Sequence, residues 1–350
     1  MILHEPIYLR SPRHVKVAGL AGQNTRVQLY CFNYPNSFPV APTYTLEKPI
    51  PSALITENTY NIAPFIRRFI KFDAPLEVST VAQTPDAHYC YCYVKVYVNG
   101  VLIDNLAGWT YKYICFDGFG YHQAGGNPTP PLSLMVEGTY YTEKTNGLGN
   151  MTVYNPDPSL SDMYIQWSHP DGFPAFSALL PKEVNNAPNV HPSLVSVGAN
   201  VDIFQDGISI ASYKFIPVCE PKYTPIKCDF VNQHGSWQRI VFFKASRSNL
   251  SVDMENYNMM TADVDYNQQD NITQSLNLNG NESITVNTGW VVENYSQTIA
   301  ELMLSEHVKL DGKPVVLKSK SIEMQESINN KNINYKMEFN YAYSTLNYNS

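Results

Sequence analysis

Residues 89–103 read YCYCYVKVYVNGVLI, and this stretch indicates the fold class of the chain. Its first ten residues alternate Tyr or Lys with Cys or Val, and the many aromatic and β-branched side chains among them favour a strand. Asn99 and Gly100 accept the positive φ angles of a type I′ turn, so the last three residues are predicted to return as the second strand of a hairpin. Residues 110–116, TYKYICF, are predicted to form a third strand, and the three could form a meander.

Two further segments alternate as half-buried strands do. Residues 26–32 place Val27, Leu29 and Cys31 on one face and polar or aromatic residues on the other. Residues 333–343 alternate in the same way and are predicted to form a long closing strand with one apolar face. Such a long strand could lie at a sheet edge and add to a neighbouring molecule, although a partner within the chain is the commoner outcome.

The region after the middle of the chain combines a polar segment with a second hairpin. Residues 251–281 are rich in Asn, Gln and Asp, and are interpreted as polar. Asp311 and Gly312 favour a turn between strands at residues 308–310 and 315–319.

A short helix is predicted near residues 296–305, with Ser296 as its N-cap and with Ile299, Leu302 and Met303 on one side. The rest of the chain is typical of strands and turns, since it contains 25 Tyr, 15 Phe and 24 Pro but only 16% charged residues. We therefore predict a mainly β fold made of β-sandwich or barrel-like domains with one short helix.

Changes in composition along the chain predict three domains. Residues 1–126 are expected to form an N-terminal β domain. Residues 127–220 contain frequent prolines, as in NPTPPLS, NPDPS and HPDGFP, and are expected to be an insert of loops or short strands that projects from the protein. Residues 221–350 are expected to form a C-terminal β domain that carries the helix.

The charge of the chain argues against several classes of partner. The formal net charge is -7, and the basic runs are short, whereas neutralising a phosphate backbone needs clustered Lys and Arg. Direct nucleic-acid binding is therefore not expected. The N-terminus, MILHEPIYLRSPRHVKV, lacks the apolar h-region of a secretory signal, and no stretch approaches the about 18 apolar residues of a membrane span.

Six cysteines are too few for a disulfide scaffold in a chain of this length. Cys90 and Cys92 lie two residues apart and so share one face of the predicted strand. A C-x-C pair can ligate a metal, but the other four cysteines form no second pair at ligand spacing. The better interpretation is that they are small core residues in a reducing cytoplasm, with the redox state of Cys90 and Cys92 left open.

The standard signatures of catalysis are absent, including G-x-S-x-G, H-E-x-x-H and G-x-x-x-x-G-K-[ST]. Residues 263–270 resemble the start of a calcium loop, but Gln268 and Gln274 stand where an EF-hand needs Gly and Glu. Candidate acids and bases exist without any pattern that pairs them: Asp117, Glu137, Asp229 and Glu293, with His122, His169 and His234. We predict no enzyme, no catalytic residue, no cofactor and no metal.

A glycine-rich loop, residues 118–126, follows the third predicted strand and is the nearest approach to a phosphate-binding loop. The NPTPP segment after it prevents a helix from starting there, so the loop is interpreted as a turn with a special backbone. Gly118, Gly120 and Gly125 are predicted to be required by that backbone.

Residues 227–246, KCDFVNQHGSWQRIVFFKAS, concentrate aromatic side chains around a His-Gly pair. Large aromatic side chains favour a core seam between two strands, and a subunit interface is the alternative, because Trp and Arg are frequent interface anchors. The candidate structural or interfacial anchors are Trp237, Arg239, Phe242 and Phe243, with Trp290 and Tyr295 as core support near the helix.

The order of several segments resembles a known family. These are PTYTL, NIAPFIRRFI, FDGFGYHQAGGNP, EPKYTPIKCDFVNQHGSWQRIVFFKAS, ESITVNTGWVVENYSQTIAELMLSEHV and INYKMEFNYAYSTLN. Together they resemble virion structural proteins in tailed phages of Bacteroidota hosts, the crAss-like phages and their relatives, and they span about Thr43 to Asn347. The resemblance implies a tail or neck protein, made in the bacterial cytoplasm, that forms a homo-oligomeric ring and contacts other tail proteins. It transfers no catalytic residue, and it leaves ring, collar, hub and fibre-adaptor roles open.

Two alternatives stay open beside this one. A receptor-binding or carbohydrate-binding module would stack Tyr140, Tyr141, Trp167 and Phe173 on the sugar rings of a host surface glycan. A virion-borne glycan hydrolase is the weakest hypothesis, because no pair of carboxylates can be nominated for it.

Overall fold

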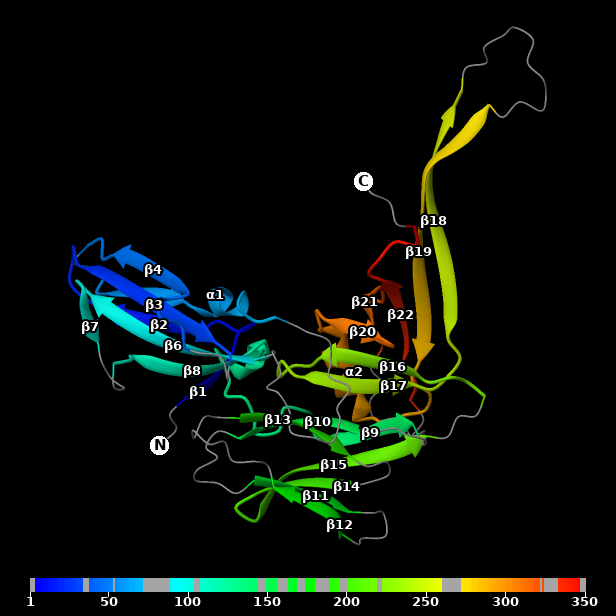
Figure 1. The fold of residues 1–350 in the computed structure, drawn as a ribbon, viewed down its shortest axis with the longest axis horizontal. Helices are drawn as coiled ribbons and strands as arrows, with labels where there is room; N and C mark the ends of the chain where they lie inside the picture. Colours follow the sequence, from blue (N-terminus) through cyan, green and yellow to red (C-terminus); the bar gives the residue numbers. More distant parts are fainter. Residues whose placement is uncertain are drawn as a thin grey trace. The chain divides into compact units, whose positions relative to one another are not determined.

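The computed structural model describes residues 4–33, 38–52, 54–71, 89–103, 108–143, 149–155, 163–168, 174–179, 189–195, 200–218, 222–259, 272–321, 323 and 333–346. The chain is built from strands, with one helix of more than seven residues in the described part (Figure 1). The predicted mainly β fold is therefore confirmed.

The chain divides into two compact units, whereas the composition predicted three domains. Unit 1 comprises Met1–Cys219, Asp229–Ile240 and Gln297–Glu306, and unit 2 comprises Glu220–Cys228, Val241–Ser296 and His307–Ser350. The proline-rich middle segment thus shares unit 1 with the N-terminal strands.

The N-terminal part of unit 1 contains a six-stranded sheet of order β1-β8-β6-β3-β4, with β7 also paired to β6. A separate pair, β2 and β5, lies antiparallel, and the short helix α1 follows β5. The elements are β1 (Glu5–Tyr8), β2 (His14–Ala18), β3 (Asn24–Phe32), β4 (Tyr44–Pro49), β5 (Glu57–Asn61), α1 (Ala63–Arg67), β6 (Tyr89–Val98), β7 (Val101–Ile103) and β8 (Tyr111–Phe116).

The predicted hairpin exists, but the meander does not. Strands β6 and β7 pair around Asn99 and Gly100, whose φ angles of 49° and 80° suit a type I′ turn. Strand β8 then pairs with residues of β6 next to those that pair with β7, so that β6 is the partner of both. The three-residue β7 is too short to serve as the template for β8.

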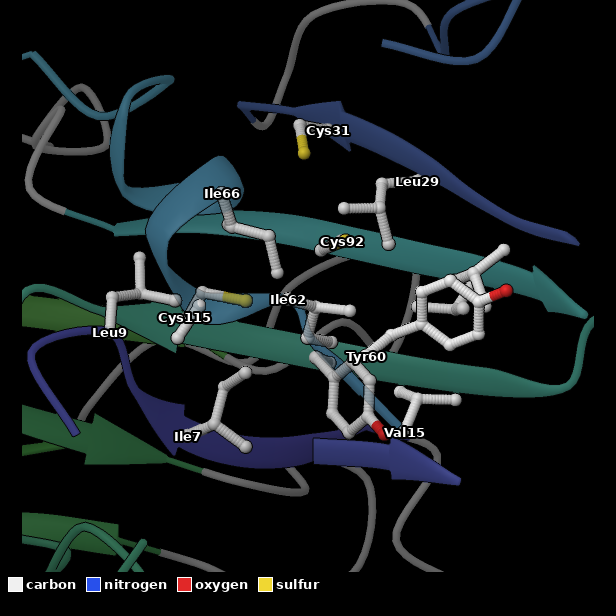
Figure 2. Close-up of a cluster of buried hydrophobic side chains, with 14 of the residues drawn as sticks. Ile7, Leu9, Val15, Leu29, Cys31, Tyr60, Ile62, Ile66, Cys92 and Cys115 are labelled. Atoms are coloured by element: carbon white, nitrogen blue, oxygen red, sulfur yellow. The ribbon is translucent and has the colours of Figure 1, made fainter. Parts of the chain in front are cut away.

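Side chains cover both faces of this sheet. One face carries the cluster in Figure 2, where Ile62 and Ile66, at the start and within helix α1, approach Cys92 and Cys115 on the sheet. The other face carries an aromatic cluster that joins Tyr8, Tyr89, Tyr91, Ile114 and Phe116 to Leu134 and Tyr154. The middle segment is therefore packed onto the N-terminal sheet through a shared core.

The middle segment forms short strands, which was one of the two structures predicted for residues 127–220. A five-stranded sheet has the order β12-β11-β14-β15-β9, and β10 and β13 form a second, two-stranded sheet. The elements from here to residue 218 are the 3-10 turn η1 (His122–Ala124) and the strands β9 (Gly138–Glu143), β10 (Gly149–Asn155), β11 (Met163–Ser168), β12 (Pro174–Leu179), β13 (Asn189–Val195), β14 (Asn200–Gln205) and β15 (Ile208–Val218).

The C-terminal strands form a seven-stranded sheet of order β17-β16-β20-β21-β22-β19-β18. Strands β18 to β22 belong to unit 2, whereas β16 and β17 are each divided between the two units. The elements are β16 (Ile226–Val231), β17 (Trp237–Phe242), β18 (Arg247–Asn258), β19 (Thr273–Asn287), α2 (Tyr295–Met303), β20 (Val308–Leu310), β21 (Lys313–Leu317) and β22 (Lys336–Tyr341).

The predicted second hairpin and the predicted helix are both present, with shifted ends. Strands β20 and β21 pair around Asp311 and Gly312, which have φ angles of 46° and 78°. Helix α2 begins one residue before Ser296, so Ser296 lies in its first turn and is not the N-cap. Ile299 and Leu302 are buried, as expected for the apolar side of the helix.

The closing strand alternates as predicted but is not an edge. Ile333, Tyr335, Met337 and Phe339 are all buried, while the residues between them are partly or fully exposed. Strand β22 itself is shorter than predicted and lies between β19 and β21, because both of its edges find partners within the chain. Among the described residues, the outermost strands of this sheet are β17 and β18.

Candidate interaction site

The aromatic residues of the 227–246 segment lie inside the protein. Trp237, Phe242 and Phe243 are each buried, and the ring centroids of Phe242 and Phe339 are 6.3 Å apart. These side chains are covered by the chain itself, as the core-seam interpretation expects, and they leave little surface for a partner.

Arg239 is engaged within unit 1. Its Nε and Nη2 atoms donate to the two carboxylate oxygens of Asp229 at 2.6 and 3.0 Å, on the neighbouring strand β16. The carboxylate is nearly buried and the guanidinium largely so. A bidentate pair of this kind fixes the two strands against each other, because the fork of Arg matches the geometry of a carboxylate.

Tyr295 and Trp290 differ in burial. Tyr295 is buried at the start of helix α2, as core support requires, but Trp290 is 59% exposed, so the expectation that it supports the core is wrong. The reason is the alternation of the backbone: the next residue, Val291, is buried and bridges to Ile333, which turns the neighbouring side chain outward.

The three predicted glycines each have a stereochemical reason to be glycine. A Cβ on Gly118 would lie 2.5 Å from Cδ1 of Tyr8, and a Cβ on Gly120 would lie 2.5 Å from Pro128. Gly125 has open space around it but a φ of 77°, which side chains rarely adopt. Close packing and a positive φ angle therefore explain why these three positions are glycine.

The candidate acids and bases do not converge. Asp117 is buried and paired with Arg67 at 2.6 Å, and Asp229 is paired with Arg239, so both carboxylates are already occupied. Glu137 and Glu293 are exposed. Within the described ranges, no three His, Cys, Asp or Glu side chains form a group that could hold a metal ion. The calcium-like segment 263–270 and His169 lie outside the described residues.

The cysteines on the N-terminal sheet face one another across strands. Cys31 is directly opposite Cys92, and Cys90 is opposite Cys115. All four are buried free thiols, and burial raises the pKa of Cys92 and Cys115 well above the ordinary value. Neutral thiols in a core behave as small apolar residues, in agreement with the sequence-based interpretation.

The aromatic residues of the glycan-binding hypothesis are only partly described. Tyr140 is buried, and its hydroxyl donates to the carbonyl of Val136 at 2.6 Å, so it offers no face to a sugar. Tyr141 is half-buried. The side chain of Trp167 and the whole of Phe173 lie outside the described residues.

A buried polar cluster in unit 1 was not found from the sequence. His234 lies in the turn between β16 and β17, and its Nδ1 atom is 2.6 Å from the hydroxyl of Tyr8. Burial lowers the pKa of His234 to about 4. The side-chain oxygen of Asn232 accepts from the backbone N–H groups of His234 and Ser236, at 3.0 and 3.1 Å, and so holds the turn.

Glu301 is the least expected member of the interior of unit 1. It is fully buried on helix α2, and neither carboxylate oxygen has a hydrogen-bond partner of normal geometry among the described residues. Burial raises the pKa of Glu301 to about 7, and the backbone of Gln233 offsets only part of that effect. The available signal was its position, three residues after the buried Thr298 and so on the same side of the helix.

Unit 2 carries an exposed hairpin, formed by β18 and β19. Figure 1 shows these two strands running side by side beyond the ends of β20, β21 and β22. All twelve residues of β18 are exposed, whereas the base of β19 pairs with β22 at Ser283–Asn287. Just beyond this pairing, the backbone N–H of Thr345 donates to the carbonyl of Gly280 at 2.8 Å, and that of Leu346 donates to the side-chain oxygen of Asn279 at 3.2 Å. We call residues 247–258 and 273–282 the arm.

The arm has one apolar face. Leu250, Val252 and Met254 alternate with Ser251, Asp253 and Glu255 along β18. Ser248, which shares the apolar side with Leu250, lies opposite the buried Ile284, so this face continues the core face of the sheet. Leu250, Val252 and Met254 are nevertheless 53%, 47% and 55% exposed. The prediction that residues 251–281 are polar was wrong for Val252 and Met254.

The comparisons with known proteins add no relative. No family model matches the chain, and no curated protein matches it. In the part of the chain that the structure describes, no helix is both long and apolar enough to cross a membrane.

Proposed function

We propose that the protein is a structural subunit of a phage tail that acts by binding copies of itself and other tail proteins. The observation that carries this proposal is the arm, a long two-stranded ribbon that shows the alternation of a half-buried strand but is exposed on both faces. A two-stranded hairpin alone is marginal in water, and a ribbon with an apolar face is stabilised when another surface covers that face.

Two further features support the same proposal. The order of segments resembles virion structural proteins of tailed phages that infect Bacteroidota. In addition, the candidate acids Asp117 and Asp229 are held in ion pairs that brace the fold, as in a protein whose role is mechanical. Ring, collar, hub and fibre-adaptor roles all use such contacts, and a closed ring requires that one surface of each copy meets a different surface of the next.

The test compares the full chain with a variant that lacks the outer arm. Val252 and Gly280 lie directly opposite each other, so residues 253–279 can be replaced by Asn-Gly, which closes a two-residue hairpin between them. The pairing of β19 with β22 is untouched by this change. Light scattering gives the mass of each protein in solution, and negative-stain imaging shows whether closed rings form.

We expect the full chain to form a discrete oligomer and the shortened variant to be monomeric with an unchanged melting temperature. A full chain that stays monomeric at tens of micromolar, alone and with co-expressed tail proteins, would contradict the proposal. So would a shortened variant that assembles as well as the full chain.

A further inference from the structure

We infer that the arm binds the arm of a second copy, with the outer edges of the two β18 strands pairing antiparallel around Ser251. This inference rests on the proposed function and adds the identity of one partner and the register of the contact. It starts from the edge of the sheet, because β18 is an outermost strand among the described residues.

The outer edge of β18 has none of the usual protection. Edge strands are commonly short, or carry proline or several lysines that prevent pairing with another chain. Strand β18 is twelve residues long, contains no proline and has Arg247 as its single basic residue. The irregularity near Asp253 inserts its extra residue in β19, since Asp253 pairs with Asn279 and Glu255 with Leu276. The outer strand therefore remains regular.

A second copy of the same strand is a chemically suitable partner for this edge. Directly opposite residues of an antiparallel pair lie on the same face, so a two-fold axis at Ser251 sets Leu250 of each copy opposite Val252 of the other. The same register places Arg247 opposite Glu255, twice by symmetry, and opposite charges in such pairs are stabilising. The apolar stripes of the two arms then form one continuous surface.

The charges also favour this register over the one shifted by two residues, which has its two-fold axis at Asp253. That register would put Asp253 opposite its own copy, and like charges directly opposite are unfavourable. The two acidic residues of β18 also make a nucleic-acid backbone an unsuitable occupant.

A two-fold contact joins copies in pairs, so a ring would need a second, different contact elsewhere on the subunit.

Cysteine cross-linking tests the register directly. In the full chain, Ser251→Cys should form a disulfide-linked dimer under mild oxidation, because the two-fold axis brings residue 251 of both copies together. Asn249→Cys and Asp253→Cys should each fail alone, but a mixture of the two should give a cross-linked heterodimer, since residue 249 lies opposite residue 253. The unmodified chain measures any background from its own cysteines.

A charge swap tests the same register without cross-linking. Arg247→Glu or Glu255→Arg should each weaken the dimer about tenfold, because each change places like charges together at two symmetric positions. The double variant should restore the affinity, since it exchanges the two signs. Ile208→Lys, at an exposed apolar site on another strand, serves as a control that should leave the dimer unchanged.

The outcomes separate this inference from the proposed function. An oligomer in light scattering that neither cross-links through Ser251→Cys nor responds to the charge swap would overturn the arm pairing and leave the structural role standing. A monomer in all conditions would overturn both. Cross-linking through Val252→Cys in place of Ser251→Cys would overturn the register that we infer.

Discussion

The hydroxyl oxygen of Tyr8 lies 2.6 Å from Nδ1 of His234, although 226 positions separate the two residues in the chain. Both residues are buried in unit 1, where the turn between β16 and β17 meets the end of β1. Gly118 lies at the same place, because a Cβ there would be 2.5 Å from the Tyr8 ring and 2.6 Å from the carbonyl oxygen of Gln233. The turn can reach Tyr8 because residue 118 has no side chain.

Gly118→Ala is therefore expected to destabilise unit 1. The added methyl group meets a buried ring and a backbone oxygen, and overpacking of this kind typically costs about 1–3 kcal/mol. In a unit of this size the melting temperature should fall by roughly 2–4 °C for each kcal/mol. Differential scanning calorimetry measures the change.

Gly126→Ala is the matched control for this prediction. It introduces the same methyl group in the same loop, where nothing lies within 4 Å. Its melting temperature should equal that of the unmodified chain. Equal stability of Gly118→Ala and Gly126→Ala would show that residue 118 does not need to be glycine.

Glu301 predicts a pH dependence of stability with a definite sign. Burial raises its pKa from an ordinary 4.5 to about 7, so the folded protein keeps a proton that the unfolded chain releases. The contribution to stability is fully present below pH 4.5, falls by about 1.4 kcal/mol for each pH unit above it, and is lost above pH 7. The total is about 3 kcal/mol.

Glu301→Gln removes this titration. The free energy of unfolding of the variant, minus that of the unmodified chain, should rise by about 3 kcal/mol between pH 4.5 and 7.5. Taking the difference cancels the opposite contribution of His234, whose neutral buried form destabilises the fold as the pH falls below its ordinary pKa of 6.5. Glu137→Gln, at an exposed site in the same unit, should give a flat difference, and a flat result for Glu301→Gln would mean that Glu301 is not buried as a neutral acid.

Local sequence signals predicted the elements that depend on local geometry. Asn99-Gly100 and Asp311-Gly312 identified the two predicted hairpins, because few other residues accept positive φ at two consecutive positions. The same signal at Asp206-Gly207, which joins β14 and β15, was not used. The alternation at Val27, Leu29 and Cys31 also predicted a buried face, and all three are buried.

Long-range pairing was not predictable in the same way. Nothing within residues 110–116 indicates that β8 pairs with β6 and with the parallel strand β1, since both edges of a strand have the same hydrogen-bonding groups. Trp290 was assigned to the core by residue type, whereas its exposure follows from the bridge of Val291 to Ile333.

The arm and Glu301 were missed for a related reason. The composition of residues 251–281 is polar on average, which concealed the alternation of Val252 and Met254 with polar residues. The position of Glu301 on the buried side of the helix could be read from the sequence, but its neighbour in the fold, the backbone of Gln233, is far away in the chain. A search for alternating apolar and polar residues within the polar segments would have found the apolar face of the arm.

Arg239 provides the last prediction, because its pair with Asp229 distinguishes a structural role from an interfacial one. Arg239→Met should lower the free energy of unfolding by about 3 kcal/mol, since it leaves a nearly buried carboxylate without its partner. Adding Asp229→Asn should recover much of the loss, because the remaining group is neutral. Denaturant unfolding followed by circular dichroism measures all three variants.

The matched control is Lys16→Met, which breaks an exposed pair with Glu57 and should leave stability unchanged, because solvent screens such pairs. If Arg239 acts mainly as an anchor for a partner, Arg239→Met would keep its stability and lose oligomer mass instead. Loss of stability with recovery in the double variant would assign the bidentate pair to the fold and exclude Arg239 as an interface anchor.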